Sequence, residues 1–277
     1  MSELNFMDLK RQYQNIKKDV LDAFLEVCEN TAFSGGPYAA KFEKEFAEYL
    51  DVKYFTGLDS GTSALDLAML ALGVRNGDEV IVPANTYIAS AWGAIHAGAK
   101  VVFIDCLPDT WEIDPEAVAK AVTEKTKAVI GVHLYGQPFD VDAIKKITDR
   151  YKISLIEDCA QAHGATYKGI KVGVFGEMGC FSFYPGKNLG AYGEAGGVSS
   201  NKKEYIDYID VVKNQGCAVR YYHDDIGGNR RLDGIQGAIL SKKLKYLPLW
   251  TGRRQEIARK YLSSISNPRI TLQKQPD

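Results

Sequence analysis

Short apolar runs alternate with helical stretches through the middle of the chain, and this rhythm constrains the fold more than any other feature. The runs include "DEVIVP", "AKVVFIDC", "KAVIGVHLYG" and "KISLIEDC", which are rich in Val, Ile and Phe. Stretches such as "SALDLAMLALG" and "DVDAIKKITDRY" separate them. Short buried strands that alternate with helices indicate βαβ units, in which the strands run parallel. The sequence therefore predicts an α/β fold with a mainly parallel central sheet.

Helical patterns flank this alternating core on both sides. Residues 5–28 have amphipathic spacing, and "GGPYAAKFEKEFAEYL" gives a Gly-Pro turn followed by a second helix. After residue 202 a further helix leads into the polar loop "CAVRYYHDDIGGNRR", and the long helical pattern that follows should kink at Pro248. The last segment contains "RITL", which is typical of the first strand of another unit.

Composition excludes several classes of function. The 277 residues carry 34 Lys and Arg against 35 Asp and Glu, so no basic excess suggests nucleic acid. No apolar run approaches the roughly 18 residues of a membrane span, and the N-terminus has no signal-peptide core. Five scattered cysteines without a CxxC pair favour reduced thiols over disulfides or structural zinc. We expect a cytoplasmic protein that binds no metal, nucleic acid or membrane.

Two polar segments that follow apolar runs are candidates for ligand binding, because parallel α/β sheets bind ligands at the carboxyl ends of their strands. Ser60-Gly61-Thr62 opens a helix, whose free N–H groups and dipole can bind a phosphate. An ordinary helix cap would have the same sequence. Tyr87 follows the next run, where its ring could cover a flat ligand or simply pack in the core.

Two charged residues lie in similar positions further along. Asp158 ends an apolar run that offers it no cation, and Gln161 follows it closely. A buried carboxylate needs a partner, although a helix cap would also explain this one. Lys187 lies in "FSFYPGKNLGAYGEAGG", just after the run that contains Ser182. A constrained and partly desolvated lysine has a lowered pKa and can form a Schiff base, whereas most loop lysines are simply exposed.

Taken together, these segments match the needs of pyridoxal 5'-phosphate. That cofactor requires a lysine for its aldehyde, an acid that keeps its pyridine nitrogen protonated, a ring that stacks on it and a phosphate cradle. The sequence does not support a Rossmann dinucleotide site or a P-loop, because the chain has neither G-x-G-x-x-G opening a helix nor G-x-x-x-x-G-K-[ST].

The ordered motifs resemble the DegT/StrS family of pyridoxal-phosphate-dependent nucleotide-sugar aminotransferases. They are "FMDLKRQY", "SGTSAL", "GDEVIVPANTYIAS", "HLYGQPFDVDAI", "IEDCAQAHGA", "FSFYPGKNLGAYGEAGG" and "GNRRLDGIQGAIL". The resemblance implies the three-layer transferase fold of type I. It also implies a helical arm over residues 1–30, a large cofactor domain over 31–230 and the start of a small C-terminal domain over 231–277, which continues further in the family.

The resemblance also implies a role for each matching residue at the cofactor ring. Lys187 would hold the aldehyde and shuttle protons. Asp158 would face the pyridine nitrogen, Gln161 would meet the ring hydroxyl, and Tyr87 would stack on the ring.

The phosphate contacts implied by the resemblance come from two subunits. Gly61, Thr62 and Ser182 would hold the phosphate within one chain. Asn229, assisted by Arg231, would cross a two-fold interface to the cofactor of a partner, so that a homodimer would share its active sites. One segment departs from the family's "GxNSRLDxLQAA", because it reads "GGNRRLDGIQGA" here, with Arg230 and Gly237 as the unusual residues.

The implied reaction is amino transfer from L-glutamate to a keto-sugar nucleotide. The segment "YYHDDIGGNRRLD" most resembles members that aminate 3-keto-6-deoxyhexoses on a thymidine nucleotide. The alternatives are a 4-keto or UDP-linked sugar, a sugar dehydratase, or a non-catalytic regulatory protein that binds the cofactor. Dehydratase members carry histidine in place of Lys187, which argues against that reading.

Overall fold

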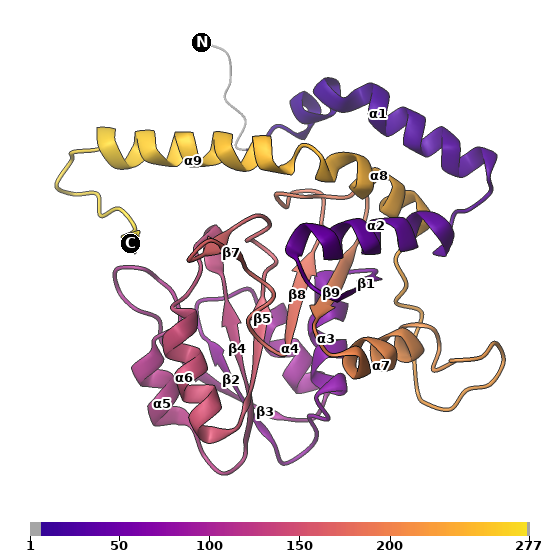
Figure 1. Ribbon diagram of the computed structural model, residues 1–277. Helices are drawn as coiled ribbons and strands as arrows, with labels where there is room; N and C mark the ends of the chain where they lie inside the picture. The colour runs from indigo at the N-terminus through magenta and orange to yellow at the C-terminus, as the bar shows by residue number, and fades with distance from the viewer. Residues whose placement is uncertain (1–6, 276–277) are drawn as a thin grey trace.

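The computed structural model describes residues 7–275, in which helices cover both faces of a seven-stranded sheet (Figure 1). Residues 1–6, at the start of the predicted arm, and residues 276–277 lie outside the described part. The three layers agree with the predicted architecture, and the reason is visible in the pattern of buried side chains.

The sheet is mainly parallel, as predicted. Its spatial order is β1 (Tyr54–Leu58), β9 (Gly196–Ser200), β8 (Met178–Ser182), β5 (Ser154–Asp158), β4 (Thr126–Val132), β2 (Glu79–Pro83) and β3 (Lys100–Ile104). Strands β8, β5, β4, β2 and β3 are parallel, and β9 runs antiparallel to both β8 and β1. A small hairpin of β6 (Thr166–Tyr167) and β7 (Ile170–Lys171) follows β5.

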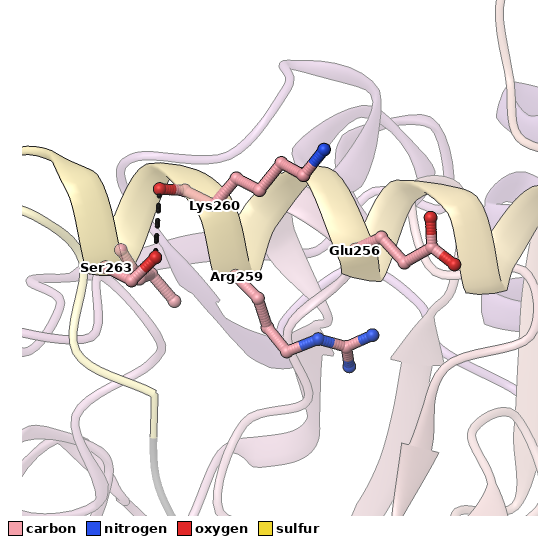
Figure 2. Close-up of a pocket in the computed structure, with 5 residues that line it drawn as sticks. Glu256, Arg259, Lys260 and Ser263 are labelled. Carbon is pink, nitrogen blue, oxygen red and sulfur yellow. Dashed lines mark hydrogen bonds between the residues drawn. The ribbon is translucent and has the colours of Figure 1, made fainter.

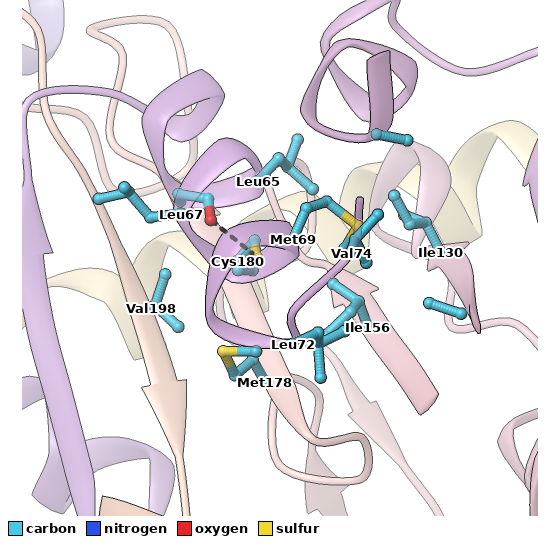
Figure 3. Packing of buried hydrophobic residues seen from close by; sticks show 14 of the residues in the cluster. Leu65, Leu67, Met69, Leu72, Val74, Ile130, Ile156, Met178, Cys180 and Val198 are labelled. Carbon is cyan, nitrogen blue, oxygen red and sulfur yellow. Dashed lines mark hydrogen bonds between the residues drawn. The ribbon is translucent and has the colours of Figure 1, made fainter. Parts of the chain in front are cut away.

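Alternate side chains of each strand enter the two opposite cores. One core lies beneath α3 (Gly61–Ala71), α4 (Ala89–His96) and α7 (Lys203–Lys213), and the other beneath α2 (Gly36–Leu50), α5 (Pro115–Ala121) and α6 (Val141–Tyr151). Val80 and Val82 pack with α3, whereas Ile81 between them packs with α5 and α6. Figure 3 shows the α3 side, where Met69 lies against Ile156 and Cys180.

The remaining helices are α1 (Leu9–Glu29), α8 (Gly234–Leu244) and α9 (Leu247–Ser264), with a short 3-10 turn, η1 (Leu134–Gly136), after β4. The predicted kinked helix is in fact two helices, and Pro248 lies in the first turn of α9, where its missing N–H costs nothing. The predicted strand at "RITL" is wrong, because residues 269–272 form a turn and irregular backbone.

The unusual Gly237 has a packing reason. A Cβ atom at this position would lie 2.8 Å from Ala39 Cα and from the Tyr38 carbonyl oxygen. Helix α8 therefore crosses α2 at backbone contact, which alanine would prevent.

Candidate active site

The carboxyl edge of the sheet brings together the residues predicted from the sequence. Asp158 is the last residue of β5 and Ser182 the last residue of β8, and these two strands pair in parallel. Tyr87 follows β2, which lies two strands away from β5, and Lys187 follows β8. The strand order alone therefore directs their side chains toward one edge.

The phosphate cradle forms where α3 begins. Gly61 is the first residue of α3, and the Oγ of Ser60 accepts a hydrogen bond from Ser63 N at 3.1 Å. The N–H groups of Gly61 and Thr62 have no acceptor among the described residues, so they are available to an anion. A Cβ atom on Gly61 would lie 2.5 Å from Ser182 Cβ, which shows that the two predicted phosphate residues are in direct contact.

Asp158 is 5% exposed and lacks a salt-bridge partner in the described part of the chain. Its carboxylate accepts hydrogen bonds from Ser90 Oγ at 2.7 Å and from Ala160 N at 3.0 Å. Two donors leave part of its acceptor capacity unused. Sequence reasoning missed Ser90, which lies fully buried near the start of α4, because its contact with Asp158 spans 68 residues.

Lys187 follows a tight turn, in which its backbone N–H donates to the Tyr184 carbonyl at 2.8 Å. Burial lowers the pKa of its amine, and the nearby charge of Asp158 partly opposes that change. The turn depends on Gly190, because a Cβ there would lie 2.3 Å from the Pro185 carbonyl oxygen. The geometry thus presents an amine that loses its proton more easily than an exposed lysine, within the electric field of Asp158.

A second lysine supports this turn from α8. Lys243 is 1% exposed, and its amine donates a hydrogen bond to the Gly190 carbonyl and lies 4.8 Å from the centre of the Tyr192 ring. Burial lowers its pKa to about 8. Nothing in the sequence pattern predicts this role, because "SKKLK" is typical of an exposed helix face.

Gln161 and Tyr87 complete the cofactor edge. The Oε1 of Gln161 accepts a hydrogen bond from Tyr135 N at 2.7 Å, which leaves its amide N–H groups free to meet a hydroxyl. The Tyr87 side chain is 69% exposed, so its ring is open to a ligand and is not part of the core.

The segment of Asn229 and Arg231 runs beside the end of β1. Arg231 forms a bridge with Leu58 and donates from Nη1 to Asn214 Oδ1 at 2.9 Å, and Asn229 forms a bridge with the same Asn214. Within the single chain, this segment lies near the start of α3 without a hydrogen bond to the other predicted cofactor residues.

The unusual Arg230 has a partner that explains it. Its Nη1 pairs with Asp66 Oδ2 of α3 at 2.9 Å, and His96 of α4 lies 3.1 Å from the other oxygen of the same carboxylate. Arg230 therefore ties the loop to the helix that begins at the phosphate cradle.

Buried ionisable groups behind the site have structural surroundings. Glu157 is fully buried and accepts hydrogen bonds from three backbone N–H groups of residues 173–176, at 2.7 or 2.8 Å, and His133 Nε2 lies 3.0 Å from it. Cys159 lies close enough to complete a set of metal-ligand types, but protein donors already occupy both oxygens of Glu157. His163 is also buried, and burial together with the Lys187 charge lowers its pKa to about 3.

Two further features lie apart from this edge. A hollow on α9 is lined by Glu256, Arg259, Lys260, Leu262 and Ser263, none of which is a predicted site residue (Figure 2). No helix in the described range 7–275 has the length and apolarity needed to cross a bilayer.

The residues of this edge fit pyridoxal phosphate as a donor set. Free N–H groups and a serine surround the phosphate position, an open ring lies nearby, and a buried acid with spare acceptor capacity accompanies a lysine whose pKa is lowered. These are the groups that the cofactor requires.

Comparison with known proteins identifies the relatives of the chain. The model of the DegT/DnrJ/EryC1/StrS aminotransferase family matches residues 14–277. The dTDP-3-amino-3,4,6-trideoxy-alpha-D-glucose transaminase of Streptomyces venezuelae is 42% identical over 94% of this chain and 69% of its own length. The pleiotropic regulatory protein of Geobacillus stearothermophilus is 44% identical over 92% of this chain and 68% of its own length. The dTDP-3-amino-3,6-dideoxy-alpha-D-galactopyranose transaminase of Aneurinibacillus thermoaerophilus is 43% identical over 96% of this chain and 74% of its own length.

Solved structures agree with this result. Streptomyces venezuelae DesV in complex with a ketimine intermediate superposes with a TM-score of 0.94 at 40% identity, covering 96% of this chain and 72% of that one. The Bacillus subtilis protein ntda with bound cofactor PMP superposes with a TM-score of 0.89 at 33% identity, covering 95% of this chain and 60% of that one. These matches confirm the predicted fold type and the predicted cofactor class, since the family depends on pyridoxal phosphate. The chain belongs to the DegT/DnrJ/EryC1/StrS family and is a nucleotide-sugar aminotransferase.

Proposed function

We propose that this chain transfers an amino group from L-glutamate to a 3-keto-6-deoxyhexose carried on a thymidine nucleotide. Two relatives that are more than 40% identical bear the names of transaminases for dTDP-3-amino sugars. The observation that carries amino transfer is the pair formed by Lys187 and Asp158: Asp158 ends β5, Lys187 follows the adjacent parallel strand β8, and the charge of Asp158 acts on the Lys187 amine.

Each residue of the edge has a definite task in this proposal. When bound, pyridoxal phosphate supplies an electrophilic aldehyde and a ring that accepts electron density. Asp158 holds a proton at the ring nitrogen, and Ser90 fixes the orientation of its carboxylate. Lys187 moves a proton through Nζ, and its lowered pKa makes that proton easier to release than the proton of an exposed lysine. Gly61, Thr62 and Ser182 bind the phosphate, while Gln161 and Tyr87 orient the ring.

Two other functions have less support. A dehydratase would require histidine at the position of Lys187. A regulatory role is suggested by the names of two relatives, a pleiotropic regulatory protein and a sensory transduction protein, but it does not explain a half-buried lysine with a lowered pKa.

The substrate is tested by product analysis. The purified protein is incubated with pyridoxal phosphate and ¹⁵N-glutamate, and separately with 3-keto and 4-keto dTDP-6-deoxyhexoses and a UDP-linked 4-keto sugar. We expect ¹⁵N in the sugar only with the 3-keto dTDP substrate, as read by mass spectrometry. Labelling of a 4-keto sugar instead would replace the substrate proposal, and elimination without label would indicate a dehydratase.

We further propose that two chains of a homodimer build each site, with Asn229 and Arg231 serving the cofactor of the partner. An exposed aromatic and aliphatic surface accompanies their loop, in which Tyr221 is 76% and Ile226 92% exposed. A two-fold dimer would make both shared sites identical.

Mixing of inactive variants tests this arrangement. Lys187→Ala and an Asn229/Arg231 double substitution are prepared separately and allowed to exchange subunits. About half of the dimers should then be mixed, and about a quarter of all sites should regain activity, because each mixed dimer has one site without a defect. If the loop serves its own chain, as its position beside β1 would permit, no activity returns although exchange is confirmed by mass spectrometry.

The domain division remains part of this proposal. Residues 31–230 would bind the cofactor, and residues 231–277 would begin a smaller domain that α8 connects to α1 and α2.

A further inference from the structure

Two aromatic residues at the carboxyl edge hold an unusual backbone conformation. Trp111 has φ of 63° and Tyr135 has φ of 57°, both in the left-handed region that bulky side chains avoid. Their rings lie 6.1 Å apart with an angle of 80° between the planes. Such strain costs free energy, and it persists where the surroundings impose it, often at ligand sites.

The surroundings that impose this conformation belong to the cofactor edge. Asn85 Nδ2 donates to the Trp111 carbonyl at 2.8 Å, and Asn85 lies two residues before Tyr87. Gln161 Oε1 accepts from Tyr135 N at 2.7 Å. Both hydrogen bonds therefore come from segments that carry proposed cofactor residues, and they fix the aromatic pair relative to the cofactor site.

The turn that precedes Trp111 is also fixed from the other side. The Thr110 carbonyl accepts hydrogen bonds from Gln273 Nε2 at 2.7 Å and from Gln137 Nε2 at 3.4 Å, and Lys274 N donates to the Asp109 carbonyl at 2.9 Å. The pair thus lies between the cofactor edge and the segment that follows α9.

Despite these hydrogen bonds, the two rings are not buried. Trp111 is 38% exposed and Tyr135 is 64% exposed. A core role would bury them, whereas here the strained backbone leaves two nearly perpendicular rings at the surface.

We propose that Trp111 and Tyr135 form the platform that binds the hexose ring of the nucleotide sugar. A perpendicular pair of rings can cover the C–H face of a pyranose and the methyl group of a 6-deoxy sugar, while the hydroxyl groups stay at the rim. The ring faces also attract the ammonium group of an amino sugar. This inference rests on the proposed function, because it names how that substrate is held.

The test uses glycine, which adopts a left-handed φ without strain. Trp111→Gly removes one ring and should not lower the melting temperature, because it also relieves the backbone. Lys152→Gly is the matched control, since Lys152 has φ of 55° and lies at the amino end of β5, away from the cofactor edge. Trp111→Phe retains an aromatic ring.

The probe is dTDP-3-amino-3,6-dideoxy-α-D-galactose, which drives the sugar half-reaction in reverse. Its affinity is measured by calorimetry, and each half-reaction is followed by the absorbance of the cofactor. We expect Trp111→Gly to weaken binding of the probe roughly tenfold, the scale of losing one aromatic contact, and Trp111→Phe to recover much of it. The half-reaction with glutamate and the Lys152→Gly control should stay within about twofold of the wild type.

Three results would overturn the platform. The first is that Trp111→Gly binds the probe as tightly as the wild type does. The second is that Trp111→Gly slows both half-reactions equally and also has a lower melting temperature. The third is that Trp111→Gly changes only the dissociation of the dimer. The proposed function is tested separately, on the wild-type protein. If the wild type carries out the half-reaction with glutamate but does not bind the probe, the dTDP-sugar substrate is rejected, and the platform is rejected with it.

Discussion

Two neighbouring carboxylates on β5 point to opposite faces of the sheet and have different surroundings. Glu157 is fully buried, and three backbone N–H groups together with His133 surround its oxygens. Asp158 is almost as buried, but only Ser90 and one backbone N–H donate to it. Both are charged groups in the interior, and the difference lies in how many donors the protein supplies.

This difference separates a structural acid from a functional one. A carboxylate whose oxygens are fully bonded stabilises the loop that bonds it and has little capacity for a ligand. A buried carboxylate with unused capacity is costly unless another group completes it. We therefore assign Glu157 to the architecture of residues 173–176 and Asp158 to the cofactor nitrogen.

Substitution of Asp158 should have the largest effect. Asp158→Asn retains the shape and removes the charge, so the electron-accepting state of the cofactor loses its electrostatic partner. We expect the half-reaction with glutamate to slow by about 10²-fold or more, as measured by stopped-flow absorbance. The melting temperature of the cofactor-free protein should hardly change, and a normal rate would refute the role of Asp158.

Substitution of Glu157 should have the opposite effect, a loss of stability with little change in the half-reaction. In Glu157→Gln, an amide N–H₂ group replaces one oxygen, so at least one buried N–H of residues 173–176 loses its acceptor. We expect the free energy of unfolding to fall by about 3 kcal/mol, as measured by urea titration. The folded fraction should keep its glutamate half-reaction, and an active-site defect without loss of stability would contradict the comparison.

Glu112 extends the comparison to a carboxyl group with hardly any donors. Neither of its oxygens has a hydrogen bond of normal geometry among residues 7–275, and burial raises its pKa to about 9, an effect that the nearby Leu134 N–H opposes only in part. The folded state therefore holds a proton that the unfolded chain has lost above its usual pKa of 4.5, so stability falls as pH rises from 4.5 to 9.

Glu112→Gln removes this dependence. The stability of the variant relative to wild type should increase between pH 5 and pH 9 by an amount on the order of a few kcal/mol. Thermal melts at several pH values measure this difference. A constant difference across that range would show that the carboxyl group is not held neutral.

The sequence predicted the parts of the molecule that depend on local pattern. Alternating apolar runs predicted the parallel sheet, and the rule for strand ends brought Asp158, Ser182 and Lys187 to one edge. The residues that it missed act over long separations, since Ser90 meets Asp158 across 68 positions and Lys243 meets Gly190 across 53. No periodicity or spacing encodes such pairs.

The incorrect predictions also have physical causes. The pattern "RITL" has β-forming residues, but a strand requires a neighbouring strand, and residues 269–272 have none in the described structure. The left-handed backbone of Trp111 and Tyr135 could not be predicted from the sequence, because that conformation is expected at glycine and asparagine and not at aromatic residues.

The central claim is that Lys187 is the residue that binds the cofactor covalently. Borohydride reduction of the cofactor-loaded protein, followed by peptide mass spectrometry, tests it directly. We predict the mass of the reduced cofactor on the peptide that contains Lys187, and no label in Lys187→Ala, although that variant should retain free cofactor. Label on a different lysine would contradict the account, and Lys243 is the informative alternative because burial also lowers the pKa of its amine, to about 8.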